Sequence, residues 1–226
     1  MKRSLKEWIL RVVLLLLGLC VAHLGVTLFL LSDLGSDPFN VLIQGLFRTL
    51  EKLTGSAVLT HGRVHVAVSL LIVLILLLTD RSYIKIGTAL CMLFGGPIID
   101  FYTMLLGPLF AGISSLPVRI AMLVLGCGIL AGGMTLVIRS DAGTGPNDLV
   151  ALVISEKSGK KFSVVRILTD ASFALAGWLL GGVVGLGTLI CMFLVGPVAG
   201  FFLPLSARLV AYAVRRFCPE SAQPSG

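Results

Sequence analysis

The stretch "SDLGSDPFN" (Ser32–Asn40) returns 108 residues later as "SDAGTGPND" (Ser140–Asp148). Each copy follows a long apolar run and carries Ser-Asp, Gly and Pro in the same order. Proline is favoured at the first position of a helix, and glycine accepts the backbone conformations of tight turns. The repeated pattern therefore predicts that an apolar helix ends in a turn at both places, and that a second helix begins at Pro38 and at Pro146.

The composition indicates an integral membrane protein. Of the 226 residues, 57% are hydrophobic and 13% are charged, whereas soluble domains carry about 25% charged residues. Apolar runs of about 18 or more residues are long enough to cross a hydrocarbon core of roughly 30 Å. The apolar run after the basic N-terminus lacks a small-residue cleavage pattern, so we expect a retained first span. The six predicted spans are Arg11–Leu31, Val64–Leu78, Ile86–Leu106, Val118–Ile138, Val164–Leu180 and Leu186–Leu205.

Two further segments, 38–53 and 146–156, are too short to cross the bilayer as helices. Each begins at a proline, with Asp37 or Gly145 in the capping position before it. They are expected to be either interfacial helices or re-entrant half-helices.

The distribution of positive charge supports six spans. With the N-terminus inside, 14 of the 18 Lys and Arg residues fall on the inner side and 4 on the outer side, as cytoplasmic loops require. Promoting both short segments to spans would weaken this bias. With six spans, both termini are expected in the cytoplasm. Because the basic residues are not clustered with aromatic ones, a nucleic-acid partner is not expected.

The chain contains an internal repeat. An offset of 108 aligns Arg, Gly, Thr, Ser, Asp and Pro residues in order, and an offset of 100 aligns "GTALCMLFGGP" (87–97) with "GTLICMFLVGP" (187–197). Each half holds three spans, and because three is odd, the second half must enter the membrane from the opposite side. The predicted fold is thus one all-α membrane domain over residues 1–226, built from two inverted three-span repeats (about 8–108 and 116–210) and a basic tail (211–226).

These paired motifs resemble those of the YczE/YitT family of bacterial integral membrane proteins. The resemblance covers roughly residues 8–210. It implies a protein of the bacterial cytoplasmic membrane and supplies no catalytic residues.

The repeated Asp33 and Asp141 have two interpretations. They could coordinate an ion or gate a substrate path, or they could simply form turns through side-chain hydrogen bonds. The exposed N–H groups of the following short helices could also bind an anion. In that case Asp37, Asn40, Asn147 and Asp148 would line a site.

Three ionisable residues within spans are further candidates, because such groups are costly in a membrane and often functional. Asp100 has Gly200 as its repeat counterpart, and it could instead sit at the outer interface. Asp170 could pair with Arg166 one turn earlier. His23 could relay protons, or it could be a neutral histidine bonded to a neighbouring helix.

The function predicted from these features is a small secondary transporter that moves a small solute or ion by rocking its inverted halves. The alternatives are a non-transporting assembly or scaffold factor, and a substrate-capturing subunit of a multi-component importer. No enzyme motif is present, and no cysteine pair has metal-ligand spacing. We therefore expect no catalysis, cofactor or metal, and the predicted partners are the lipid bilayer, a homo-oligomer or another membrane protein.

Overall fold

The computed structural model describes residues 4–35, 37–55, 61–112 and 115–219, and every regular element within these ranges is helical. Five helices are long and apolar enough to cross a membrane, and α3 adds a shorter apolar stretch over Arg63–Thr79. The chain is thus a membrane protein with several apolar helices, and the predicted span that falls short is the second. The helices are α1 (Leu5–Leu31), α2 (Pro38–Thr54), α3 (His61–Thr79), η1 (Arg81–Tyr83), α4 (Ile86–Phe110), α5 (Leu116–Ser140), α6 (Pro146–Ser158), α7 (Phe162–Leu179) and α8 (Leu186–Phe217).

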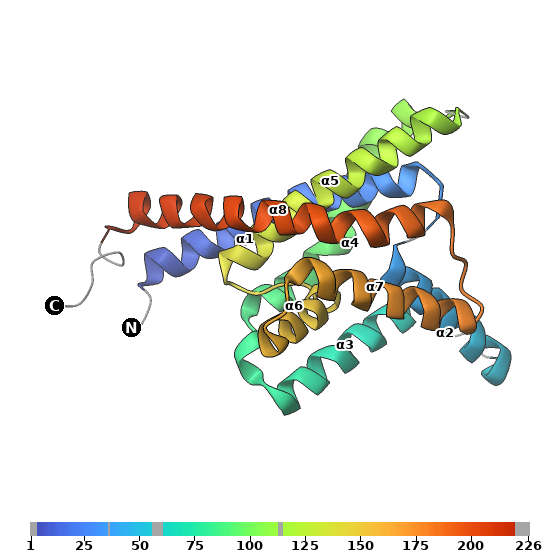
Figure 1. Cartoon of the computed structure of the whole chain (residues 1–226), viewed down its shortest axis with the longest axis horizontal. Coiled ribbons are helices and arrows are strands. Elements are labelled where there is room, and N and C mark those ends of the chain that lie inside the picture. The colour runs from blue at the N-terminus through green and yellow to red at the C-terminus, as the bar shows by residue number, and fades with distance from the viewer. Residues whose placement is uncertain (1–3, 36, 56–60, 113–114, 220–226) are drawn as a thin grey trace.

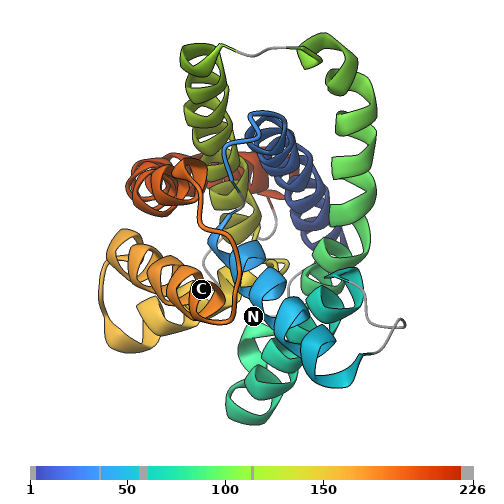
Figure 2. The same ribbon diagram turned by 90° about the vertical axis from the view of Figure 1, so that its right-hand side faces the viewer.

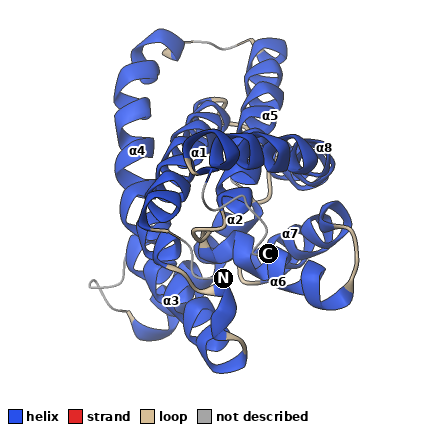
Figure 3. Cartoon of the chain, turned by 90° about the vertical axis from the view of Figure 1, so that its left-hand side faces the viewer, coloured by secondary structure: helices blue, strands red, loops and turns tan. Residues whose placement is uncertain are grey.

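The helices form two groups. In the first, α1 packs against α5 and α4, and α5 packs against α8. The second contains α2, α3, α6 and α7, and it contacts the first mainly through α7 and α8 (Figure 1). Helix α4 stands at the edge of the first group beside α1 (Figures 2 and 3).

Both predicted short helices are present and begin where the sequence indicates. Asp37 caps α2, because its carboxylate accepts hydrogen bonds from the backbone N–H groups of Phe39 and Asn40. Each short helix then ends at a glycine in the left-handed conformation, Gly55 (φ 59°) for α2 and Gly159 (φ 66°) for α6.

The segments 32–35 and 140–143 form the same turn. Asp33 and Asp141 have φ values of 50° and 57°, and Gly35 and Gly143 have φ values of 137° and 138°. Aspartate tolerates the left-handed region because its short side chain can bond locally, whereas the glycines adopt a φ that side-chain-bearing residues rarely reach. Both Ser-Asp-x-Gly segments thus form a turn with positive φ at the aspartate and at the glycine.

Glycines bring α1 and α5 into backbone contact. A Cβ on Gly25 would lie 2.3 Å from the backbone nitrogen of Leu130, and one on Gly133 would lie 2.2 Å from that of Ala22. Only glycine fits at such distances, and small residues are the usual means of close helix packing in membranes.

Several contacts between the halves occur in pairs related by the two sequence offsets. In each pair, exchanging every residue for its counterpart in the other half gives the second contact. In the first pair, Arg11 Nη1 donates to Ser140 O (2.9 Å) and Arg119 Nε donates to Ser32 O (2.6 Å). In the second pair, Gly87 N donates to Ala142 O (2.9 Å) and Gly187 N donates to Leu34 O (2.8 Å).

Helix α8 is longer than predicted and continues through much of the region predicted to be a basic tail. Pro204 does not end it, and the following segment is rich in Ala, Leu and Arg, which favour helix. Val210 and Ala213 of this extension pack against Leu14 of α1. Residues 220–226 of the tail lie outside the described residues.

Candidate functional site

A cluster of three charged side chains lies inside the molecule, where α6 meets α7. The guanidinium of Arg166 on α7 donates from Nη1 to Asp148 Oδ1 (2.5 Å) and from Nε to Asp170 Oδ2 (2.9 Å). Arg166 is 7% exposed and Asp170 is 1% exposed. We call Asp148, Arg166 and Asp170 the charge cluster.

The charge cluster holds two carboxylates for one guanidinium, so one negative charge is in excess. Asp148 lies in the first turn of α6, where the helix dipole favours a carboxylate. The capping residue Asp37 of α2 is close enough for its charge to act on Asp170. The starts of the two short helices therefore lie within electrostatic reach of one buried aspartate.

His23 is half-buried on α1, and the charge of Asp148 also acts on its imidazole. Its Nδ1 lies 2.7 Å from the carbonyl oxygen of Leu19, one turn earlier on the same helix. Its Nε2 faces α4 at Gly95, where a Cβ would lie 3.0 Å away. The hydrogen bond is thus made within α1, whereas the sequence suggested a partner on a neighbouring helix.

The other predicted site residues are dispersed. Asp33 is exposed and pairs with Arg119 (2.9 Å), and Asp141 pairs with Lys85 at the corresponding turn of the second half. Asp100 is exposed on α4. Asn40 and Asn147 are half-buried at the starts of the short helices, and Asn40 donates to Asp37 (2.5 Å).

Pairing with Arg166 was one of two interpretations of Asp170 in the sequence, and the two side chains do pair. The sequence interpretation missed Asp148 as the second partner, since that contact depends on how α6 packs against α7. One signal was available, because Arg166 is the only basic residue within the last two predicted spans, and its repeat counterpart is Val66.

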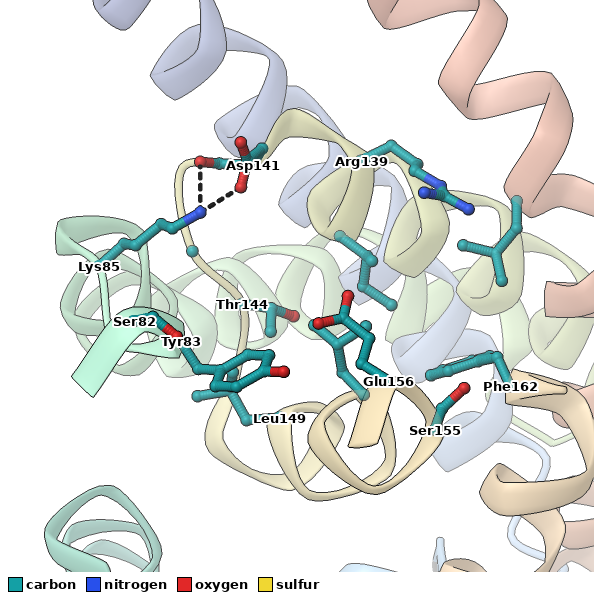
Figure 4. Close-up of a pocket in the computed structure, with 14 residues that line it drawn as sticks. Ser82, Tyr83, Lys85, Arg139, Asp141, Thr144, Leu149, Ser155, Glu156 and Phe162 are labelled. Atoms are coloured by element: carbon teal, nitrogen blue, oxygen red, sulfur yellow. Dashed lines mark hydrogen bonds and ion pairs between the residues drawn. The ribbon is translucent and has the colours of Figure 1, made fainter. Parts of the chain in front are cut away.

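A cavity of about 450 Å³ lies beside α6. Figure 4 shows Tyr83, Thr144 and Glu156 close together, with the Lys85–Asp141 ion pair to one side and Arg139 to the other. Apolar side chains complete the wall. The lining residues are Ser82, Tyr83, Lys85, Ile138, Arg139, Asp141, Gly143, Thr144, Leu149, Leu152, Ser155, Glu156, Phe162 and Leu203.

The carboxylate of Glu156 lies close to the hydroxyl of Tyr83 (Figure 4) and raises the pKa of that phenol above its usual value. The sequence gave no motif for this cavity, because its polar residues come from the end of α5 and the loop after it, from the second half of α6, and from η1 and the residues that follow it. Helix α6 carries both Asp148 and much of the cavity wall, so it connects the cavity with the charge cluster.

Apolar helices around a buried charge cluster define a polytopic helical membrane protein. Residues 9–204 match the model of a family of unknown function, DUF6198, and the chain belongs to this family. It is 31% identical to the "uncharacterized membrane protein YczE" of Bacillus subtilis (strain 168), over 93% of this chain and 94% of that protein.

Two further relatives are similar over most of their lengths. An "uncharacterized protein" of Haemophilus influenzae is 30% identical over 87% of this chain and 84% of its own, and YyaS of Bacillus subtilis is 24% identical over 85% and 92%. No solved structure matches the chain. The resemblance to YczE seen in the paired motifs is thereby confirmed.

Proposed function

We propose that this protein is a secondary transporter of the bacterial cytoplasmic membrane that moves a small solute together with protons. It has six spans in two inverted three-span repeats, its termini are cytoplasmic, and it carries out no catalysis. The single observation behind this proposal is the buried charge cluster at the start of a short helix that does not itself cross the membrane.

The inverted architecture is supported by the paired contacts between the halves. Arg11 binds the C-terminus of α5, and its counterpart Arg119 binds the C-terminus of α1. Such reciprocal contacts are typical of two units related by a two-fold axis. The start of α1 and the end of α8 lie at the same end of the molecule (Figure 1), which agrees with an even number of crossings.

The charge cluster supplies a reason for coupling to protons. Burying an unpaired charge is costly, so the carboxylate in excess over Arg166 binds either a proton or a cationic group. A proton bound there would be released when solute or solvent reaches the cluster. Half-helix starts near the middle of the membrane are the usual location of substrate and ion sites in inverted-repeat transporters.

The test is transport by the purified protein in liposomes that contain a trapped pH-sensitive dye. A panel of amino acids, organic acids, amines and sugars is added outside. We expect at least one solute to acidify the lumen. Asp170→Asn should abolish this acidification, whereas Glu51→Gln, an exposed position on α2, should retain it. Absence of both dye response and radiolabelled uptake for the whole panel would contradict the proposal.

The alternative function of an assembly factor is favoured by one observation. Only 11% of the most apolar 18-residue stretch of α4 is buried inside the molecule. For α8, the counterpart of α4 in the second half, the buried share is 39%. An exposed helix of this kind is available to another membrane protein. Purification of a stoichiometric membrane partner, lost when α4 positions such as Phe101 are changed to Ala, would support this alternative.

A further inference from the structure

We infer that the cavity beside α6 binds a small zwitterionic solute, namely an α-amino acid with an apolar side chain. The inference rests on the proposed function, because it names the class of solute that the transporter recognises. Its evidence, however, comes from the cavity and not from the charge cluster.

The first observation is a buried hydroxyl that lacks a partner. Thr144 is 2% exposed, and its Oγ1 has no hydrogen-bond partner among the described residues. Leaving such a group unsatisfied costs about 1–3 kcal/mol. Thr144 lines the cavity, and in Figure 4 its hydroxyl points towards Glu156. A bound ligand would supply the missing partner.

The second observation is the arrangement of charge. Lys85 and Asp141 neutralise each other, which leaves Glu156 on α6 and Arg139 on α5 as opposite charges on two sides of the cavity (Figure 4). An ammonium group fits beside the Glu156 carboxylate and the Tyr83 hydroxyl, and a carboxylate fits beside Arg139. A solute with one charge of each sign therefore complements the cavity.

The third observation is the apolar part of the wall. Leu149, Leu152 and Phe162 line the cavity together with Ile138 and Leu203. The volume of about 450 Å³ falls in the range of about 300–1,000 Å³ that is common for small-molecule sites. These side chains provide space for an aliphatic or aromatic substituent.

The two halves differ in residue size where α2 and α6 pack against their neighbours. In the other half a Cβ on Gly45 of α2 would lie 2.3 Å from the carbonyl oxygen of Gly177 on α7, so these helices are in contact. The counterparts of these glycines are Val153 and Leu77, and Val153 packs against Leu76 of α3.

In the first half, the loop after α7 also packs onto α2. Arg48 donates to Gly181 O (2.6 Å), Thr49 donates to Leu180 O (2.9 Å), and Gln44 accepts from Val183 N (2.7 Å). In the second half the counterpart of Arg48 is Glu156, which faces the cavity.

The experiment measures binding to the full-length protein in detergent by scintillation proximity, with tritiated leucine, methionine and phenylalanine as probes. We expect saturable binding of at least one. For leucine, the competitors are 4-methylpentanoate, which lacks the ammonium, and 3-methylbutylamine, which lacks the carboxylate. Each should compete at least about tenfold less well than leucine, because each loses one charge-assisted contact.

Two variants and two matched controls locate the site. Glu156→Gln should weaken binding about tenfold or more, and Glu51→Gln should not change it. Thr144→Val should weaken binding while raising the melting temperature of the free protein, because it removes an unsatisfied buried hydroxyl. Thr88 is also 2% exposed with an unpartnered Oγ1, but does not line the cavity, so Thr88→Val should raise the melting temperature without affecting binding.

The inference is overturned if none of the three amino acids binds saturably, if 4-methylpentanoate binds as tightly as leucine, or if Glu156→Gln and Thr144→Val bind like wild type. These outcomes are separate from those of the transport assay. Binding without uptake would support the amino-acid site and contradict the transporter. Uptake of another solute without amino-acid binding would support the transporter and contradict the amino-acid site.

Discussion

At the scale of single residues, the charge cluster gives the clearest prediction. Arg166→Ala leaves Asp148 and Asp170 buried without their shared guanidinium. Removing one partner of a buried ion pair costs about 3–5 kcal/mol, so we expect a large fall in the melting temperature of the detergent-purified protein. Arg208→Ala, at an exposed position of α8, should change stability by less than about 0.5 kcal/mol.

A compensating variant separates electrostatics from lost packing. If the uncompensated carboxylates cause the loss, adding Asp148→Asn and Asp170→Asn to Arg166→Met should recover much of the stability. If the triple variant is as unstable as Arg166→Ala, then charge is not the main contribution of the cluster.

Tyr83 and Glu156 give a prediction about pH. The Glu156 carboxylate raises the pKa of the Tyr83 phenol above its ordinary value of 10.0, because it favours the neutral hydroxyl. The stabilising contact is therefore fully present below pH 10 and is lost as the pH rises through the higher pKa of the folded protein. An ultraviolet titration should show one of the 3 tyrosines ionising at lower pH in Glu156→Gln. An unchanged titration curve, like that expected of Glu51→Gln, would contradict the contact.

At the scale of elements, the glycines of α1 and α5 differ in the space that is available for a Cβ atom. Gly133→Ala and Gly25→Ala push a Cβ into backbone atoms, and should destabilise the protein by at least about 1–3 kcal/mol. Gly128 on the same helix α5 has open space, so Gly128→Ala should be neutral or stabilise by up to about 1 kcal/mol. Thermal unfolding in detergent measures all three, and equal effects would contradict the close contact.

Most elements could be predicted from the sequence because their ends carry local signals, such as the Asp37 cap and the glycines that follow the short helices. The packing of α4 could not. Gly196 and Gly200 let α8 approach Ser163 at the start of α7, but the counterpart of Gly200 is Asp100. Gly96, the counterpart of Gly196, is kept, but a Cβ on it would meet no atom within 4 Å, and this difference becomes visible only when both halves are compared in space.

The charge cluster and the cavity were predictable only in part, for the same reason. Asp148 and Asp170 stand out as ionisable residues in an apolar chain, whereas Tyr83, Thr144 and Glu156 resemble ordinary residues of loops and helix surfaces. What distinguishes the cavity residues is that the repeats differ there, with Glu156 replacing Arg48 and Lys85 replacing Gly185. In a duplicated chain, equivalent positions with unequal chemistry indicate where one half has acquired a role of its own.

At the scale of the whole molecule, the inverted arrangement predicts that the two short helices end on opposite sides of the membrane. Lys52, near the end of α2, and Lys160, after α6, are both exposed. In a chain with all five cysteines replaced, Lys52→Cys should react with a membrane-impermeant maleimide in intact cells. Lys160→Cys should react only after permeabilisation, because three spans lie between equivalent points of the two halves. Labelling of both positions from the same side would rule out the inversion and, with it, the rocking of two opposed halves around the charge cluster.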